Sequence, residues 1–107
     1  MIEMWFNAIY SSYFRTIKKL IKSGIDINMK NPISSNRDSA IMEACIQNNI
    51  ILIDLLIDNG ADVNFKNDYN DTPLHFCKGF IDASKMLIES GADLTNINNF
   101  NQSILKN

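Results

Sequence analysis

His75 is the only histidine of the chain, and it lies in the segment 71–77, DTPLHFC. Asp71 precedes it by four residues and Cys77 follows it by two, so an acid, a base and a nucleophile stand close together in sequence. Catalysis would require a base that a third group orients beside a nucleophile in a cleft. A zinc site would require more ligands than His75, Cys45 and Cys77, which show no C-x-x-C or H-x₃-H spacing. Support for an enzyme or a metal site is therefore weak, and the alternative role of the segment is structural.

The composition argues against several classes of partner. The net charge of −2 gives no bulk attraction to nucleic acid or to an anionic membrane. The longest apolar run, residues 50–57, is far too short to span a bilayer. Glycine-rich phosphate-binding motifs are missing from the sequence. We therefore expect no nucleic acid, no membrane, no cofactor and no small-molecule substrate.

The sequence favours an intracellular protein, either cytoplasmic or, if it comes from a pathogen or virus, in the host cytoplasm. The N-terminal segment has no basic region of the kind that opens a secretory signal. Two cysteines 32 positions apart do not form the dense disulfide framework of a small secreted domain. We expect Cys45 and Cys77 to be reduced and unlinked, as small buried hydrophobic residues.

Three segments of the chain resemble one another. Residues 59–68 read NGADVNFKND, and they are echoed by SGADLTNINN at 90–99 and by SGIDINMKNP at 23–32. Each copy follows an apolar run with helical spacing, and another short helix-compatible segment precedes that run. The repeat unit is therefore predicted to be helix, tight turn, helix and extended loop.

The glycine of each copy has a physical role in this unit. Gly24, Gly60 and Gly91 stand just after the last helical turn, where a residue with positive φ is needed. The segments that follow are rich in Asn and Asp, which favour turns by bonding to nearby backbone groups. The loops are therefore predicted to be hairpin-like.

The joint motifs resemble those of the ankyrin repeat family. TPLH at 72–75, followed by the small residue Cys77, resembles the signature T-P-L-H-x-A, and GADVN at 60–64 resembles the end of a repeat. The resemblance implies an all-α fold, an ankyrin-repeat solenoid of stacked helix-turn-helix units joined by β-hairpin-like loops. A single domain over residues 1–107 would hold three units, about 1–31, 32–67 and 68–98, plus the start of a fourth at 99–107.

The resemblance also implies a structural role for the opening segment. Thr72 would cap a helix, and Pro73 would take its first position, where no backbone donor is needed. His75 would bond to neighbouring backbone and threonine groups and so tie adjacent repeats together. We therefore interpret Thr72, Pro73, His75, Gly24, Gly60 and Gly91 as structural residues rather than as parts of a site.

The departures from a regular repeat are informative. The first unit has EMWF in place of TPLH, which predicts an N-terminal capping helix, and the second unit has SAIM there. The third unit is two residues shorter, so its first helix or turn is predicted to be abbreviated near Lys78. The loop 31–38 carries three extra residues. The last segment, NQSILKN, would start a fourth unit and stop within its first helix.

The family resemblance implies binding of another protein through the hairpin tips and the exposed side of the first helices. The candidate tip residues are Met29, Lys30, Arg37, Asp38, Phe65, Lys66, Asp68, Tyr69, Asp71, Ile97, Asn99 and Phe100. The candidates on the first helices are Asn7, Tyr10, Glu43, Ile46, Phe76 and Lys78. Large aromatic residues at polar tips are typical of binding hot spots, and the alternative is that they pack on a neighbouring hairpin.

Three classes of function stay open at this stage. The leading one is a protein-interaction module, as an adaptor, a host-binding protein of a pathogen, or an inhibitor of a partner enzyme. The second is a structural part of a longer repeat array whose binding surface lies elsewhere. An enzyme is disfavoured because no catalytic constellation accompanies His75.

Overall fold

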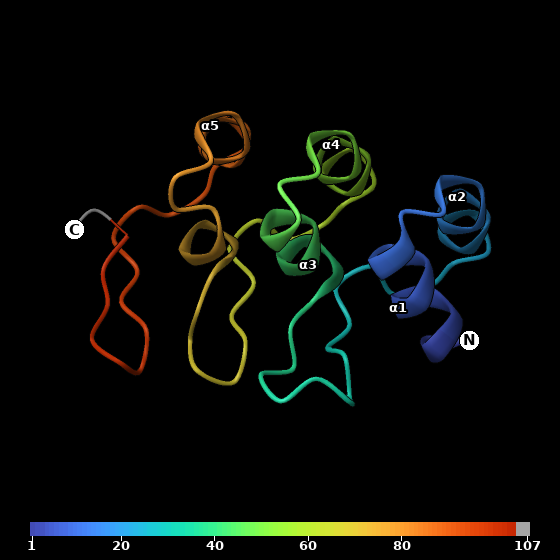
Figure 1. Ribbon diagram of the computed structural model, residues 1–107, viewed down its shortest axis with the longest axis horizontal. Coiled ribbons are helices and arrows are strands. Elements are labelled where there is room, and N and C mark those ends of the chain that lie inside the picture. The colour runs from blue at the N-terminus through green and yellow to red at the C-terminus, as the bar shows by residue number, and fades with distance from the viewer. Residues whose placement is uncertain (105–107) are drawn as a thin grey trace.

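The computed structural model describes residues 1–104, and within them the chain folds into helix pairs separated by long loops (Figure 1). The helices are α1 (Ile2–Ser11), α2 (Phe14–Lys22), α3 (Ala40–Ile46), α4 (Ile50–Asp58), the 3₁₀ helix η1 (Pro73–Phe76) and α5 (Ile81–Glu89). We call residues 25–39, 61–72 and 92–103 the first, second and third loops. None of the helices in the described part is long and apolar enough to cross a membrane.

The helix pairs stack side by side into a short solenoid. In Figure 1, α2, α4 and α5 form an outer row, while α1, α3 and η1 form an inner row from which the loops extend. Contacts join α1 to α3 and α3 to η1 along the inner row, and α4 to α5 along the outer row. We call the exposed side of the inner row, together with the adjoining loops, the concave face. The predicted all-α solenoid is confirmed.

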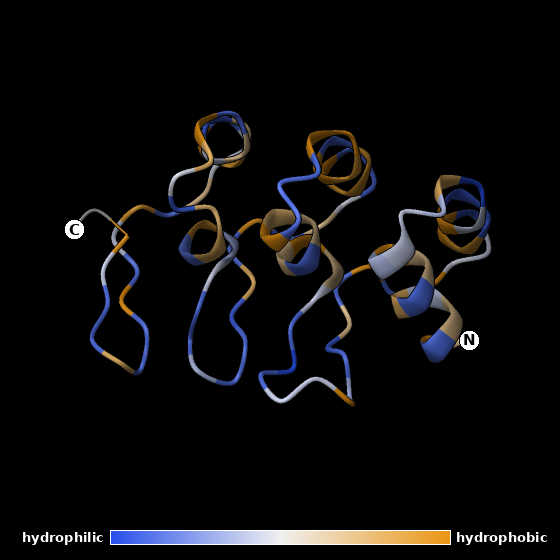
Figure 2. Cartoon of the chain, viewed as in Figure 1, coloured by the Kyte–Doolittle hydropathy of each residue, from blue (hydrophilic) through white to orange (hydrophobic). Residues whose placement is uncertain are grey.

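The core lies between the two rows of helices, and the sequence of each helix reflects its place. In α2, Ile17 and Leu20 are buried, whereas Lys18 and Lys22 are exposed on the outer surface, as expected for an amphipathic helix. The middle helix α3 is covered by neighbours on both sides, and most of its residues are buried. Figure 2 shows the consequence, with apolar residues concentrated in the helices and polar residues along the loops.

Turns with positive φ end the helices where the sequence predicts them. The glycines at 24, 60 and 91 have φ of 96°, 95° and 98°, a conformation that side chains rarely adopt. The same region of φ recurs between the two helices of each unit, at Ser12, Asn48 and Gly79. Each loop adds a further residue with positive φ, at Arg37, Asn70 or Asn101, so left-handed positions recur at three equivalent places along the chain.

The third unit is abbreviated, as its length predicts. Its first helix is η1, a single stretch of 3₁₀ helix of four residues, where the other units have α-helices of ten and seven. Thr72 caps η1, and Pro73 opens it. The reciprocal bonds between Thr72 and His75 form a capping box, which satisfies backbone donors that such a short helix would otherwise leave free.

The loops keep a hairpin-like course with little strand pairing. Within residues 1–104 the only bridge of β type joins Ile97 to Ser103. Each loop instead folds around a buried asparagine that stands seven residues after the capping glycine: Asn31, Asn67 or Asn98. The Asn67 side chain, for example, accepts from the backbone N–H groups of Tyr69 and Asp71, both at 2.9 Å. The hairpin shape is thus fixed by side-chain bonds to backbone.

Two further expectations concern the cysteines and the last segment. Cys45 and Cys77 are both free and buried, and the Cys77 thiol and burial raise the pKa of Cys45. Ile104 packs against the core, but residues 101–104 form no helix, and the remainder of the predicted fourth helix, residues 105–107, lies outside the described residues.

Candidate functional site

His75 is fully engaged by the scaffold. Its Nδ1 atom lies 3.0 Å from the backbone nitrogen of Thr72, which can only donate, so Nδ1 accepts. Its Nε2 atom lies 3.2 Å from the carbonyl oxygen of Gln102 in the third loop, and it therefore carries the proton and donates. One ring thus joins the start of η1 to the next loop, an arrangement that fits the structural role that the resemblance implied.

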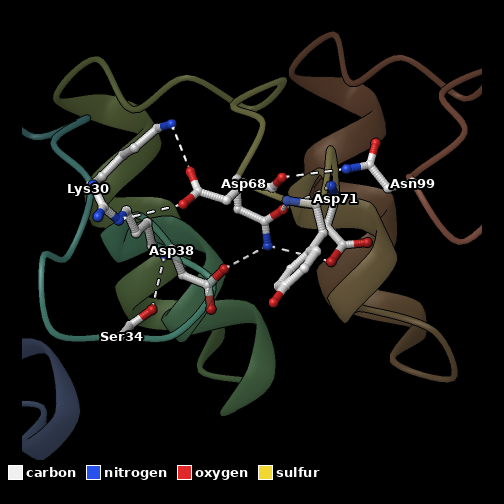
Figure 3. A network of polar contacts seen from close by, with 9 residues as sticks. Lys30, Ser34, Asp38, Asp68, Asp71 and Asn99 are labelled. Atoms are coloured by element: carbon white, nitrogen blue, oxygen red, sulfur yellow. Dashed lines mark hydrogen bonds and ion pairs between the residues drawn. The ribbon is translucent and has the colours of Figure 1, made fainter.

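The charged residues at the tips of the first two loops pair with one another. Asp68 accepts from Lys30 Nζ at 3.1 Å and from Arg37 Nε at 3.4 Å, and Figure 3 shows this bridge. All three side chains are well exposed, so the pairs contribute little to stability. They do direct the two basic groups of the first loop towards the second loop.

A second set of predicted residues links the loops from inside. The Asn67 amide donates to Asp38 at 2.8 Å and to Asp71 at 3.3 Å. The Asn98 amide donates to the other oxygen of Asp71 at 2.6 Å. Asp38 and Asp71 therefore hold neighbouring loops together, in addition to any role in binding (Figure 3).

The aromatic side chains of the tips pair between neighbouring loops. The rings of Tyr69 and Phe100 lie with their centroids 5.3 Å apart, tilted by 39°. The backbone N–H of Asn99 donates to the Tyr69 carbonyl at 2.8 Å beside them. Packing on a neighbouring hairpin is thus confirmed for this pair. Phe65 is the aromatic residue nearest to Tyr69 in sequence, but it is half-buried, and within residues 1–104 the ring that pairs with Tyr69 is that of Phe100. Phe100 stays 62% exposed.

The remaining predicted residues divide by exposure. Exposed members of the predicted surface are Asn7, Tyr10, Lys30, Arg37, Ile46, Lys66, Asp68, Lys78, Ile97, Asn99 and Phe100. Half-buried members are Met29, Asp38, Glu43, Phe65, Tyr69, Asp71 and Phe76. Met29 and Phe76 pack against the core, so both also have a structural task.

Two half-buried carboxylates, those of Asp38 and Glu43, lie on the concave face near α1 and α3. Burial raises the pKa of Asp38, against the hydrogen bond from Asn67, and Asp71 adds to the increase. Burial likewise raises the pKa of Glu43, with Asp38 adding to it and Gln47 opposing it. The ion pairs within residues 1–104 involve neither Asp38 nor Glu43. This part of the face is therefore rich in negative charge that no cation of the described chain neutralises.

The structure adds a groove that sequence reasoning missed. It lies between α1 and the first loop, and Ile2, Phe6 and Tyr10 line it from the helix while Pro32 and Ile33 line it from the loop. The available signal was the extended loop 31–38, which places an apolar residue, Ile33, in a polar segment. The position of Ile33 against α1 depends on the course of the folded loop, and the spacing of the repeat motifs in the sequence does not predict that course.

Known proteins share this sequence pattern and fold. Residues 5–98 match the family model for ankyrin repeats in three copies. An ankyrin repeat protein of Acanthamoeba polyphaga mimivirus is 28% identical over 123 aligned positions, which cover 94% of this chain and 21% of the viral protein. Palmitoyltransferase AKR1 of Kluyveromyces lactis is 30% identical over 97 positions, covering 87% of this chain and 13% of the enzyme.

The fold is also found in a solved structure. The crystal structure of the ankyrin repeat domain of Bcl-3, a member of the IkappaB protein family, superposes with a TM-score of 0.84 at 29% identity. The match covers 92% of this chain and 43% of that one. The chain spans between 3% and 21% of the length of the curated relatives that it matches.

Proposed function

Because this chain belongs to the ankyrin repeat family, whose members are generally protein-interaction modules, we propose that it binds a partner protein through its hairpin tips and concave face. It would act inside a cell as an adaptor or as an inhibitor that covers a partner's working surface. A viral relative with the same repeats makes a host protein a reasonable class of partner.

The observation that carries this proposal is the aromatic pair at the tips of the second and third loops. Phe100 covers Tyr69 yet leaves 62% of its own surface in water, which contributes little to the core. Rigid aromatic area of this kind is enriched among binding hot spots. The loop-to-loop hydrogen bonds from Asn70 and Asn99 hold the tips in place before any partner arrives.

The test compares two variants in capture and titration of a partner. Replacing Tyr69 and Phe100 by alanine should weaken binding by roughly 1–4 kcal/mol, the range of a hot spot. The matched control reverses two exposed charges of α2, Lys18→Glu and Lys22→Glu, and should change binding by less than about 1 kcal/mol.

Both variants must first melt like the parent protein. Loss of binding in the lysine variant, with the aromatic variant intact, would place the binding surface on the outer row of helices instead. Binding that neither variant affects would refute the tips as the contact surface.

A further inference from the structure

The groove between α1 and the first loop is a built feature. It has a volume of about 330 Å³, within the range that accommodates small ligands and side chains. Two bonds fix its loop wall: the Asn31 N–H donates to the Asp38 carbonyl at 2.9 Å, and the Ile33 N–H donates to the Asn31 side chain at 3.2 Å. The Asn31 amide also donates to the Tyr10 hydroxyl at 3.3 Å and ties the loop to α1.

Ile33 has no evident role in folding. It is 82% exposed, although the walls that it faces, Ile2 and Phe6 of α1, are apolar. An isoleucine left in water gains nothing for the core, whereas it would bury apolar surface if a side chain from another molecule lay between the loop and the helix. The groove thus offers an apolar contact that the chain itself leaves open.

The rim of the groove is acidic. Glu3 lines it directly, and Tyr10 separates it from Glu43 and Asp38, whose charges both act on the Tyr10 hydroxyl. The two basic residues of the same loop, Lys30 and Arg37, both pair with Asp68 of the second loop. An apolar cavity beside unneutralised carboxylates complements a ligand that carries an apolar group next to positive charge.

We propose that this groove binds a linear segment of a partner protein in which an apolar side chain is flanked by lysine or arginine. The apolar side chain would fill the space between Ile33 and α1, and the basic side chains would reach Glu3 and Glu43. This inference rests on the proposed function and names the chemistry of the segment. An acidic segment would be repelled by the same carboxylates.

The probe for this inference is a fluorescein-labelled synthetic peptide with one leucine between lysine and arginine residues. Fluorescence anisotropy measures its affinity, and two control peptides replace the leucine by serine or the basic residues by glutamate. We expect each control peptide to bind at least about tenfold more weakly, as for the loss of a hot-spot contact. Chemical shifts of ¹⁵N-labelled protein should change at Tyr10, Ile33 and Glu43.

Matched protein variants separate the groove from the rest of the surface. Ile33→Ser should weaken binding of the leucine peptide by about tenfold, whereas Ile81→Ser, which removes an isoleucine that is 80% exposed on α5, should leave it unchanged. Glu43→Gln should weaken binding several-fold and flatten its salt dependence, whereas Glu89→Gln on α5 should do neither.

Equal affinity for basic and acidic peptides, or no effect of Ile33→Ser, overturns the groove assignment. Shifts confined to Tyr69 and Phe100 overturn it as well, and they leave the proposed function standing. No binding of the leucine peptide overturns the groove alone, because capture of a whole partner by the tips is measured independently with the Tyr69 and Phe100 variants.

Discussion

At the scale of single residues, His75 shows how one side chain can serve two neighbouring units. Its Nδ1 accepts from Thr72 at the start of its own unit, and its Nε2 donates to Gln102 in the following loop. Since both ring nitrogens are occupied, neither is available as a general base. The histidine that stood out in the sequence as a candidate for chemistry is therefore part of the packing.

The corresponding prediction is that His75→Ala costs stability. Removing the ring leaves the Thr72 N–H without its partner, at a cost of roughly 1–3 kcal/mol in urea unfolding. It also removes one of the two bonds to the Gln102 carbonyl, which still accepts from the Asn98 N–H. Amide exchange at Thr72 should become faster, a local effect that a general loss of packing would not single out. Asp82→Ala, at an exposed site on α5, is the control. Coincident unfolding curves for the histidine variant and the parent would contradict the structural role.

At the scale of elements, the starts of α3 and η1 can be compared directly because they occupy equivalent places in successive units. Thr72 and Ser39 both stand at the cap, but Met42 replaces the histidine of the third unit. As a result the Ser39 hydroxyl is buried with no hydrogen-bond partner among residues 1–104, whereas the Thr72 hydroxyl lies 3.2 Å from His75 Nδ1. Only one of the two caps is complete.

Substitution by alanine should therefore destabilise the protein at Thr72 but not at Ser39. Thr72→Ala should destabilise the protein by about 0.5–2 kcal/mol, the usual cost of losing a helix cap. Ser39→Ala removes an unsatisfied buried hydroxyl and should be neutral or slightly stabilising. Thermal or urea unfolding of the two variants under the same conditions measures the difference. A loss at Ser39 as large as that at Thr72 would show that the Ser39 hydroxyl has a partner after all.

Elements that repeat along the chain were predictable from the sequence. Counting from the cap to the glycine gives 21 residues in the second unit and 19 in the third, and the missing two residues appear as the short helix η1. The glycine turns follow from the same register, because their positive φ restricts the residue type. The buried asparagine of each loop stood seven residues after each glycine and could have been found in the same way.

Contacts between units were harder to predict. Phe65 is close to Tyr69 in sequence, yet Tyr69 pairs with Phe100, which lies 31 positions away. Stacking brings residues one repeat apart next to each other, so sequence distance is a poor guide to contacts at the tips. The groove at Ile33 depends on the course of an enlarged loop, which the repeat pattern does not encode.

At the scale of the whole molecule, the stack is small and its polar surface is uneven. Its dimensions are 38 × 26 × 20 Å, and the main contacts between helices of different units join successive units along the rows. The outer row presents lysines such as Lys18 and Lys22, whereas Asp38 and Glu43 are half-buried on the concave face. Half-buried carboxylates without cations disfavour the folded state at neutral pH, and this gives the molecule a characteristic pH dependence.

The direction of that dependence follows from the pKa shifts. The folded-state pKa values of Asp38 and Glu43 are raised above their ordinary values of 3.8 and 4.5, so folding favours their protonated forms. Their unfavourable contribution is fully present above the raised pKa values and is relieved as the pH falls through them towards the ordinary values. Asp38→Asn with Glu43→Gln should therefore stabilise the protein at pH 7 by on the order of 1 kcal/mol, since partial exposure limits the effect.

The measurement is urea unfolding of this double variant and of the parent at a series of pH values from neutral to about 4. The advantage of the variant should shrink steadily as the pH falls, because the parent carboxylates become protonated first in the folded state. Asn at position 38 can still accept the 2.8 Å bond from Asn67, so the loop contact is retained. A stability difference that does not vary with pH would mean that folding does not raise the pKa values of the two carboxylates. Burying them on the concave face would then not destabilise the folded protein.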